Sequence, residues 1–292
     1  MEKILLTGGR GFFASRLADY YKDKYEFIVT GKDNLDITDE EAVYRFVEKT
    51  KPDIIIHAGA VAVTDFCNQH PEIAHKINVE AAVSVGKAAK ENGAKMVFLS
   101  SEQIFNGNLN DGPFSEKDEA KPNTVYGENK LEAEGRLKDI LNELWIVRFT
   151  WMFGLPERGK SMSNGILWET MTKLMQHETI VASKREFRGM TYVYEMIENF
   201  PVLFAAPYGI WHMGSVNQES RYEIVKFIIE ELGLGHLTEK VLKEDTKKYL
   251  DSNRDVRLDT SKAEAAGMHW SATKDALKKC IHEYQIYSQN AK

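Results

Sequence analysis

The chain has 292 residues, with 38 basic and 44 acidic side chains and a formal net charge of −6. This mild acidity excludes the basic face typical of nucleic-acid-binding proteins, and no apolar run approaches the length of a membrane span. A hydrophobic fraction of 43% is typical of a globular protein with one large domain or two small ones. Cys67 and Cys280 lie far apart. We therefore expect free thiols in a reducing cytoplasm.

Short apolar runs alternate with amphipathic segments in the first half of the chain. Strands are predicted at residues 3–7, 26–30, 53–57, 95–99 and 144–149. Helices are predicted at residues 12–21, 39–49 and 71–92. The strands are nearly continuous runs of Ile, Val and Leu, as expected where helices cover both faces of a parallel sheet. The fold class that this indicates is α/β, with a doubly wound parallel sheet.

The second half is less regular. Its predicted elements are helices at residues 168–176, 222–232, 261–266 and 273–287, and a strand at 209–213. Residues 106–123 are rich in Gly, Pro and Asn and predict a long surface loop before a helix that starts near Tyr126. We expect residues 1–155 to form the core, completed by segments near 180–213. Residues 156–292 then form most of a smaller substrate-binding subdomain that interleaves with the core.

A glycine-rich turn follows the first predicted strand and opens the first helix. It has Gly8, Gly11 and Ala14 at the spacing Gly-x-x-Gly-x-x-Ala. Glycines permit a tight turn and let a pyrophosphate approach the N–H groups of a helix N-terminus. The pattern alone also fits an ordinary strand–helix turn, but its position after a strand favours dinucleotide binding.

Two cations accompany this turn. Lys32 follows the second predicted strand, where a carboxylate would bind the ribose of NAD, and Arg10 lies within the turn. Two cations suit a 2′-phosphate, which favours NADP(H) and leaves NAD(H) compatible. Either residue also fits a solvated surface charge. Asp36 is a candidate for contact with the adenine or for the start of a helix.

Tyr126 and Lys130 are four residues apart at the start of a predicted helix, so both project from one face. An unperturbed tyrosine has a pKa of about 10, and we expect the Lys130 ammonium to lower the pKa of Tyr126. Tyr126 then protonates a carbonyl oxygen as hydride reaches the carbon. Ser100 and Ser101 follow the fourth predicted strand, at the sheet edge where ligands bind, so a hydroxyl there is suited to polarise the same carbonyl.

Together these motifs, with Ala58, Gly59 and Ala60 after the third strand, resemble the extended short-chain dehydrogenase/reductases, whose sheet is of the Rossmann type. The sequence is further similar to their dTDP-4-dehydrorhamnose reductase branch. The matching stretches are residues 35–39 (LDITD), 51–57 (KPDIIIH), 77–80 (INVE), 104–107 (IFNG) and 148–151 (RFTW), and more weakly 188–192 and 258–262.

The resemblance implies roles for the matching positions. The implied catalytic residues are Ser101, Tyr126 and Lys130. The implied cofactor-binding residues are Gly8, Arg10, Gly11, Phe12, Phe13, Lys32, Asp36, Ile37, Ala58, Gly59, Ala60, Asn78, Ser100, Tyr126 and Lys130, with Asn78 supporting Lys130 through the long helix. The implied substrate-binding residues are Asp65, Glu102, Gln103, Trp151 and Arg188. No protein-ligated metal is expected, Mg²⁺ at a subunit contact stays open, and a homodimer is compatible.

Glu102 and Gln103 depart from the Asp-Tyr pair that these reductases carry, and His57 stands where they usually have Asn. The related sugar-nucleotide dehydratases use Asp-Glu after the hydroxyl, and Gln103 cannot act as that base, which disfavours elimination. The resemblance therefore implies an NAD(P)H-dependent reductase of a keto group on a nucleotide-linked sugar. An epimerase or reductase of another hydroxylated substrate and a non-catalytic dinucleotide-binding regulatory subunit remain alternatives.

Overall fold

The computed structural model describes residues 1–286, so the last residue of the helix predicted at 273–287 lies outside the described part. Six parallel strands form the main sheet in the order β10-β5-β4-β3-β1-β2. They are β1 (Lys3–Thr7), β2 (Glu26–Val29), β3 (Ile54–His57), β4 (Lys95–Ser101), β5 (Leu144–Phe149) and β10 (Gly209–Met213). The strand order reverses between β1 and β3, and ligands of doubly wound sheets bind at the C-terminal ends of such strands. The predicted doubly wound α/β sheet is thus confirmed.

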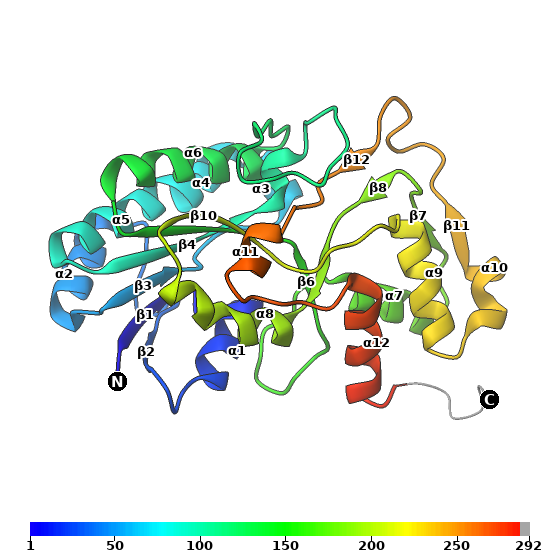
Figure 1. The fold of residues 1–292 in the computed structure, drawn as a ribbon, viewed down its shortest axis with the longest axis horizontal. Coiled ribbons are helices and arrows are strands. Elements are labelled where there is room, and N and C mark those ends of the chain that lie inside the picture. The colour runs from blue at the N-terminus through cyan, green and yellow to red at the C-terminus, as the bar shows by residue number, and fades with distance from the viewer. Residues whose placement is uncertain (287–292) are drawn as a thin grey trace.

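Helices cover both faces of this sheet because its apolar side chains alternate between them. Leu5 and Ile55 pack against α2 (Glu40–Thr50), α5 (Ala81–Asn92) and α6 (Val125–Ile140). Ile4, Leu6 and Ile54 belong to the opposite core, with α1 (Phe12–Tyr20) and α8 (Val193–Asn199). Figure 1 shows α5 and α6 on the upper side of the sheet, α2 at its left end, and α1 and α8 below it.

The long helix predicted at residues 71–92 contains one irregular turn. It consists of α4 (Pro71–His75), a π-helical turn at Lys76–Glu80 and α5, and it ends at Gly93 with a positive φ of 66°. A short helix that the sequence did not indicate, α3 (Thr64–Gln69), precedes it. Single π turns within helices occur frequently at functional sites, and this one carries Lys76 and Asn78.

The second half of the chain forms a smaller lobe at the right of Figure 1. Its short strands pair as β6 (Trp151–Phe153) with β9 (Met190–Tyr192), β7 (Ile180–Ala182) with β11 (Leu242–Glu244), and β8 (Glu186–Phe187) with β12 (Arg254–Asp255). Its helices are α7 (Ile166–Met175), α9 (Arg221–Glu231), α10 (Thr238–Val241) and α12 (Thr273–Glu283), whereas α11 (Ser261–Ala265) packs against β10 of the main sheet. From this half β10 returns to pair with β5 at the edge of the main sheet, so the two parts interleave along the chain.

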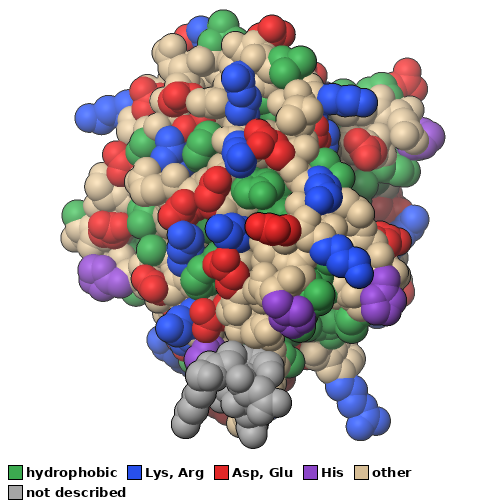
Figure 2. Space-filling model, turned by 90° about the vertical axis from the view of Figure 1, so that its right-hand side faces the viewer, with side chains coloured by type: hydrophobic (Ala, Val, Ile, Leu, Met, Phe, Trp, Pro, Cys, Tyr) green, Lys and Arg blue, Asp and Glu red, His purple; other side chains and the backbone are tan. Residues whose placement is uncertain are grey.

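The surface at the smaller-lobe end mixes basic and acidic side chains, as Figure 2 shows. Within residues 1–286, no helix combines the length and the apolarity needed to cross a membrane. Cys67 and Cys280 are both buried, and neither forms a disulfide, which confirms the expected free thiols.

Candidate active site

Two cavities lie at the C-terminal ends of the central strands and share Gly8 and Ala60 in their walls. The larger has a volume of about 850 Å³, and the smaller about 480 Å³. Predicted site residues that line the larger cavity are Gly8, Gly11, Phe12, Phe13, Ala58, Ala60, Ser100, Ser101, Glu102, Gln103, Tyr126, Lys130, Trp151 and Arg188. Those that line the smaller one are Gly8, Lys32, Asp36, Ile37, Gly59 and Ala60.

The glycine-rich turn is packed against the end of β3. Gly8 has a φ of +65°, and a Cβ atom added there would lie 2.7 Å from backbone atoms of Ala58 and Gly59. Gly11 caps α1, whose first turn starts with Phe12 and Phe13 at the larger cavity. The first N–H groups of a helix have no partner within the helix, so this turn presents donors where an anion can bind.

The smaller cavity carries two lysines and one carboxylate. Asp36 Oδ1 accepts hydrogen bonds from the Thr38 N–H and hydroxyl at 2.9 and 2.8 Å. These bonds, followed by the charges of Lys32 and Lys76, hold the pKa of Asp36 below its usual value. Lys76 comes from the π turn and was not predicted, because nothing in the sequence indicates that the long helix approaches the end of β2.

Arg10 lines neither cavity. Its side chain is 71% exposed and forms an ion pair with Asp33, which follows β2. Because the Arg10 guanidinium is already paired with Asp33, it could bind a 2′-phosphate only by giving up this ion pair. Lys32 and Lys76 are the cations that the structure brings into the cavity wall.

Tyr126 and Lys130 lie in the first two turns of α6, and both are buried. Thr124 caps this helix by accepting from the Gly127 N–H at 3.2 Å, which places Tyr126 at its start. Lys130 Nζ donates to the Leu99 carbonyl at 2.7 Å, and it lies 5.9 Å from the centre of the Tyr126 ring. The helix therefore aims both groups at the end of β4.

The prediction that the pKa of Tyr126 lies below its usual value is wrong for this structure. Burial raises the pKa of Tyr126 to about 12, although a hydrogen bond with Ser101 acts to lower it. Burial also lowers the pKa of Lys130 to about 8. The cost of burying a charge thus outweighs the hydrogen bond with Ser101, and it keeps the phenol of Tyr126 protonated. A protonated tyrosine is the form needed to donate a proton.

The two serines after β4 point to different partners. Ser101 begins the 3₁₀ turn Glu102–Phe105, and its hydroxyl accepts from the Gln103 N–H at 3.2 Å. The Ser100 hydroxyl donates to Glu134 at 2.5 Å, and Glu134 pairs with Arg148 inside the protein at 2.7 Å. Ser101 is therefore the hydroxyl available beside Tyr126, whereas that of Ser100 belongs to a buried network.

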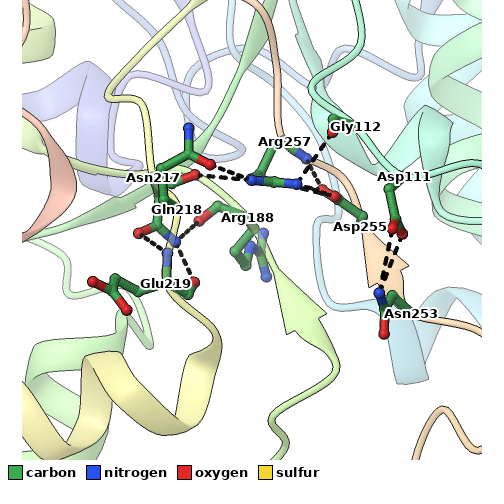
Figure 3. Close-up of polar contacts among 9 residues, drawn as sticks. All are labelled: Asp111, Gly112, Arg188, Asn217, Gln218, Glu219, Asn253, Asp255 and Arg257. Atoms are coloured by element: carbon green, nitrogen blue, oxygen red, sulfur yellow. Dashed lines mark hydrogen bonds and ion pairs between the residues drawn. The ribbon is translucent and has the colours of Figure 1, made fainter.

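Charged and aromatic side chains form another part of the wall of the larger cavity. Buried Glu102 forms an ion pair with buried Arg188, whose guanidinium carbon lies 4.4 Å from the centre of the Trp151 ring. Burial raises the pKa of Glu102, and the charge of Arg188 opposes this rise. The Asn217 side chain holds the Arg188 carbonyl with a 2.8 Å hydrogen bond, seen in Figure 3.

Gln103 extends this wall and is held by Arg254. Gln103 Oε1 accepts from Arg254 Nη2 at 3.3 Å, and Arg254 also pairs with Glu186 at 3.0 Å. Arg254 was missed because it lies in the two-residue strand β12, 151 positions from Gln103. The two-residue strands β8 and β12 show no clear alternation of apolar and polar side chains that a sequence pattern could detect.

Two further residues, Asp65 and Asn78, lie away from their predicted contacts. Asp65 is exposed on α3, and its neighbour Thr64 lines the larger cavity instead. Asn78 binds the backbone of Val61 through both amide atoms, at 2.8 and 3.1 Å. Within residues 1–286 it forms no hydrogen bond with Lys130. Its contacts therefore hold the segment after Ala60, and not the lysine.

A segment that the sequence analysis did not assign also reaches the larger cavity. Residues 161–164 line it, and fully buried Arg16 of α1 holds this segment in place through hydrogen bonds. Arg16 donates to Glu157 at 2.7 Å and to the Ser161 carbonyl at 2.9 Å.

His57, at the end of β3, is buried, and its Nδ1 atom lies at hydrogen-bond distance, 2.8 Å, from Thr7 Oγ1. Burial lowers the pKa of His57 to about 3.

Solved structures share this fold over almost the whole chain. A dTDP-4-dehydrorhamnose reductase from Clostridium acetobutylicum superimposes with a TM-score of 0.85 at 25% identity, covering 97% of this chain and 99% of that one. The dTDP-4-dehydrorhamnose reductase of Bacillus anthracis, in complex with NADP, superimposes with a TM-score of 0.82 at 22% identity over 97% and 99% of the two chains.

Sequence comparisons agree with the structural ones. The spore coat polysaccharide biosynthesis protein SpsK of Bacillus subtilis is 29% identical, over 97% of this chain and 98% of its own length. The family model described as RmlD substrate binding domain matches residues 1–286. The predicted resemblance is thereby confirmed, and the chain belongs to the RmlD substrate binding domain family.

Proposed function

We propose that the protein is an NADPH-dependent reductase of a keto group on a nucleotide-linked sugar. The observation that carries this proposal is the larger cavity, which brings Ser101, Tyr126 and Lys130 together beside the N-terminus of α1. Membership of a family with structural neighbours named dTDP-4-dehydrorhamnose reductase supports the same reaction. Residues 156–292 then contribute most of the sugar-binding half.

The residues present fit a nicotinamide dinucleotide. The glycine-rich turn offers N–H donors for a pyrophosphate, and the two cavities meet at Gly8 and Ala60 on either side of it. When bound, the reduced cofactor supplies the hydride that the carbonyl carbon accepts. Gly8, Gly11, Phe12 and Phe13 would hold the pyrophosphate, and the smaller cavity would hold the adenosine.

The side chains of the larger cavity then supply the proton. Ser101 donates a hydrogen bond to the carbonyl oxygen, and Tyr126, kept protonated by burial, transfers its proton to that oxygen. Lys130, held by the Leu99 carbonyl, places a positive charge beside the phenolate that forms. The proton on the product hydroxyl thus comes from Tyr126.

Preference for NADPH over NADH is part of the proposal. Lys32 and Lys76 line the smaller cavity, where the 2′-phosphate would attract both ammonium groups. The same cavity holds Asp36, but that carboxylate is occupied by two hydrogen bonds from Thr38.

The two buried thiols without a disulfide support the reducing cytoplasm as the location.

Replacing the proton donor tests the function. We expect the wild type to oxidise NADPH in the presence of dTDP-4-dehydrorhamnose. Tyr126→Phe should lower kcat by about 10²- to 10⁴-fold, the usual contribution of a positioned acid, while the protein still binds NADPH. Stopped assays of sugar product and calorimetry of NADPH binding give the two readouts. Equal turnover by both proteins would refute the role of Tyr126.

A further inference from the structure

A buried carboxylate on α6 contacts the end of β4 one residue away from the contact of Lys130. Lys130 Nζ donates to the Leu99 carbonyl at 2.7 Å. One helical turn later, Glu134 Oε1 accepts from the Ser100 hydroxyl at 2.5 Å. Because residues four apart share one face of a helix, Lys130 and Glu134 both face this strand end. Together they fix the register of α6 against the strand that carries Ser101.

Arg148 of β5 orients this carboxylate from the other side. Its Nη2 donates to Glu134 Oε2 at 2.7 Å, and its Nε donates to Glu134 Oε1 at 3.0 Å. A two-point contact with a guanidinium favours an ionised carboxylate.

The third nitrogen of Arg148, Nη1, lies 3.2 Å from Nε2 of buried His212. His212 Nδ1 lies 3.0 Å from the Phe114 carbonyl, which can only accept. His212 therefore donates through Nδ1 and accepts from Arg148, so its ring is neutral. Burial lowers the pKa of His212 to about 3, which agrees with this assignment.

The charge of Glu134 opposes the effect of burial on Lys130. Burial lowers the pKa of Lys130 to about 8, and the negative charge of Glu134 acts against this fall. Both side chains are buried, so water screens their attraction less than it would at the surface. Glu134 therefore favours the ammonium form of Lys130.

Titratable groups that approach the lysine from other elements are uncharged at neutral pH or already paired. Burial raises the pKa of the Cys67 thiol of α3 and lowers the pKa of His57 of β3 to about 3, so neither carries a charge. Glu102, which lines the same cavity, is in an ion pair of its own. His75 of α4 pairs with Glu132 on the exposed side of α6.

Resting on the reductase function proposed above, we propose that Glu134 is a positioning residue for the proton transfer. Its carboxylate, oriented by Arg148, keeps Lys130 charged and holds α6 in register with the end of β4. The charged Lys130 then stabilises the phenolate that Tyr126 becomes when it gives its proton to the carbonyl oxygen. Glu134 is fully buried, so it acts through Lys130 and does not touch the substrate.

The charge of Lys130 can be followed without turnover. Protein with ¹⁵N-labelled lysines is titrated by NMR through the neutral and alkaline range, and the Lys130 Nζ signal is identified by its absence in Lys130→Arg. We expect a midpoint near pH 8 in the wild type. Glu134→Gln should lower this midpoint by at least about one pH unit, because an opposite charge beside the lysine is lost. Glu134→Asp keeps the charge and should titrate close to the wild type.

The same variants are assayed with NADPH and dTDP-4-dehydrorhamnose across the same pH range. If the midpoint falls by about one unit, kcat/KM of Glu134→Gln should be about fivefold below that of the wild type at pH 8, and the difference should shrink at lower pH. Glu132→Gln makes the same charge change on the exposed side of α6 and should retain the wild-type profile. A loss that is equal at every pH would show a purely structural role and overturn the inference.

A double variant separates the charge of Glu134 from the guanidinium that Glu134→Gln leaves unpaired. Glu134→Gln/Arg148→Gln removes both charges, so it leaves no unpaired buried ion and also serves if the single variant does not fold. We expect the same lowered midpoint of Lys130. A midpoint equal to that of the wild type would overturn the inference.

The two readouts distinguish this inference from the proposed function. If the wild type turns over no keto sugar, the proposed function fails. The NMR midpoint then still decides whether Glu134 keeps Lys130 charged.

Discussion

Burial controls the chemistry of the two ionisable residues at the centre of the site. It raises the pKa of Tyr126 to about 12 and lowers the pKa of Lys130 to about 8. The sequence pattern identifies both residues but describes only their spacing, and so it suggests that the lysine governs the tyrosine. Desolvation depends on the surrounding protein, including Phe98, whose ring centre lies 4.7 Å from Lys130 Nζ. Sequence spacing alone could not reveal this effect.

The lowered pKa of Lys130 predicts a pH dependence. Below about pH 8 Lys130 is charged, and above it the ammonium is lost, so kcat/KM for NADPH should fall about tenfold per pH unit above pH 8. Tyr126 stays protonated throughout this range. Lys130→Arg carries a charge that does not titrate there and should shift the decline to higher pH. If kcat/KM of Lys130→Arg declines over the same pH range as that of the wild type, another group causes the decline.

Lys76 and Lys32 should set the choice of dinucleotide. Lys76→Ala and Lys32→Ala each remove one charge from the smaller cavity. NADPH affinity should therefore fall about tenfold, while NADH affinity should change by less than about twofold. Calorimetry measures both, and Lys90→Ala, an exposed lysine on α5, serves as the control. Equal losses of affinity for NADPH and NADH would show that these lysines do not recognise the 2′-phosphate.

At the scale of elements, the β1–α1 turn depends on a glycine that no other residue can replace without strain. Gly8→Ala forces a positive φ and a contact with the end of β3, and should lower the free energy of unfolding by about 2 to 4 kcal/mol. Gly135→Ala, in α6 with open space around it, should raise it by ~0.5 to 1 kcal/mol. Urea unfolding compares the two, and equal effects would contradict the packing argument.

The elements that the sequence predicted are those with strong local patterns. Apolar runs revealed β1, β3, β4 and β5, and the glycine-rich turn revealed the start of α1. The π turn at Lys76–Glu80 and the small sheets of the second lobe were not predicted, because strands of two or three residues show little periodicity. Glu102 and Arg188 were both predicted at the site, but their ion pair joins residues 86 positions apart and required the fold.

For the whole molecule, the arrangement of two lobes explains how one site combines a cofactor with a sugar. The first half of the chain supplies the glycine-rich turn, Ser101 at the end of β4, and Tyr126 from α6. The second half supplies Arg188 from the β8–β9 connection, and Arg254 of β12 hydrogen-bonds to Gln103. The cavity is lined from both halves: the residues proposed for the reaction come from the first half, and Arg188 and residues 161–164 of the second half line the rest of it.

Isotope transfer tests the central claim most directly. The protein is incubated with dTDP-4-dehydrorhamnose and NADPH that carries deuterium at the transferable position of the nicotinamide, and the sugar product is analysed by mass spectrometry and NMR. The account predicts one deuterium on the former carbonyl carbon and one NADP⁺ formed per sugar reduced. Binding of both compounds without transfer of deuterium would contradict it and favour a non-catalytic dinucleotide-binding subunit.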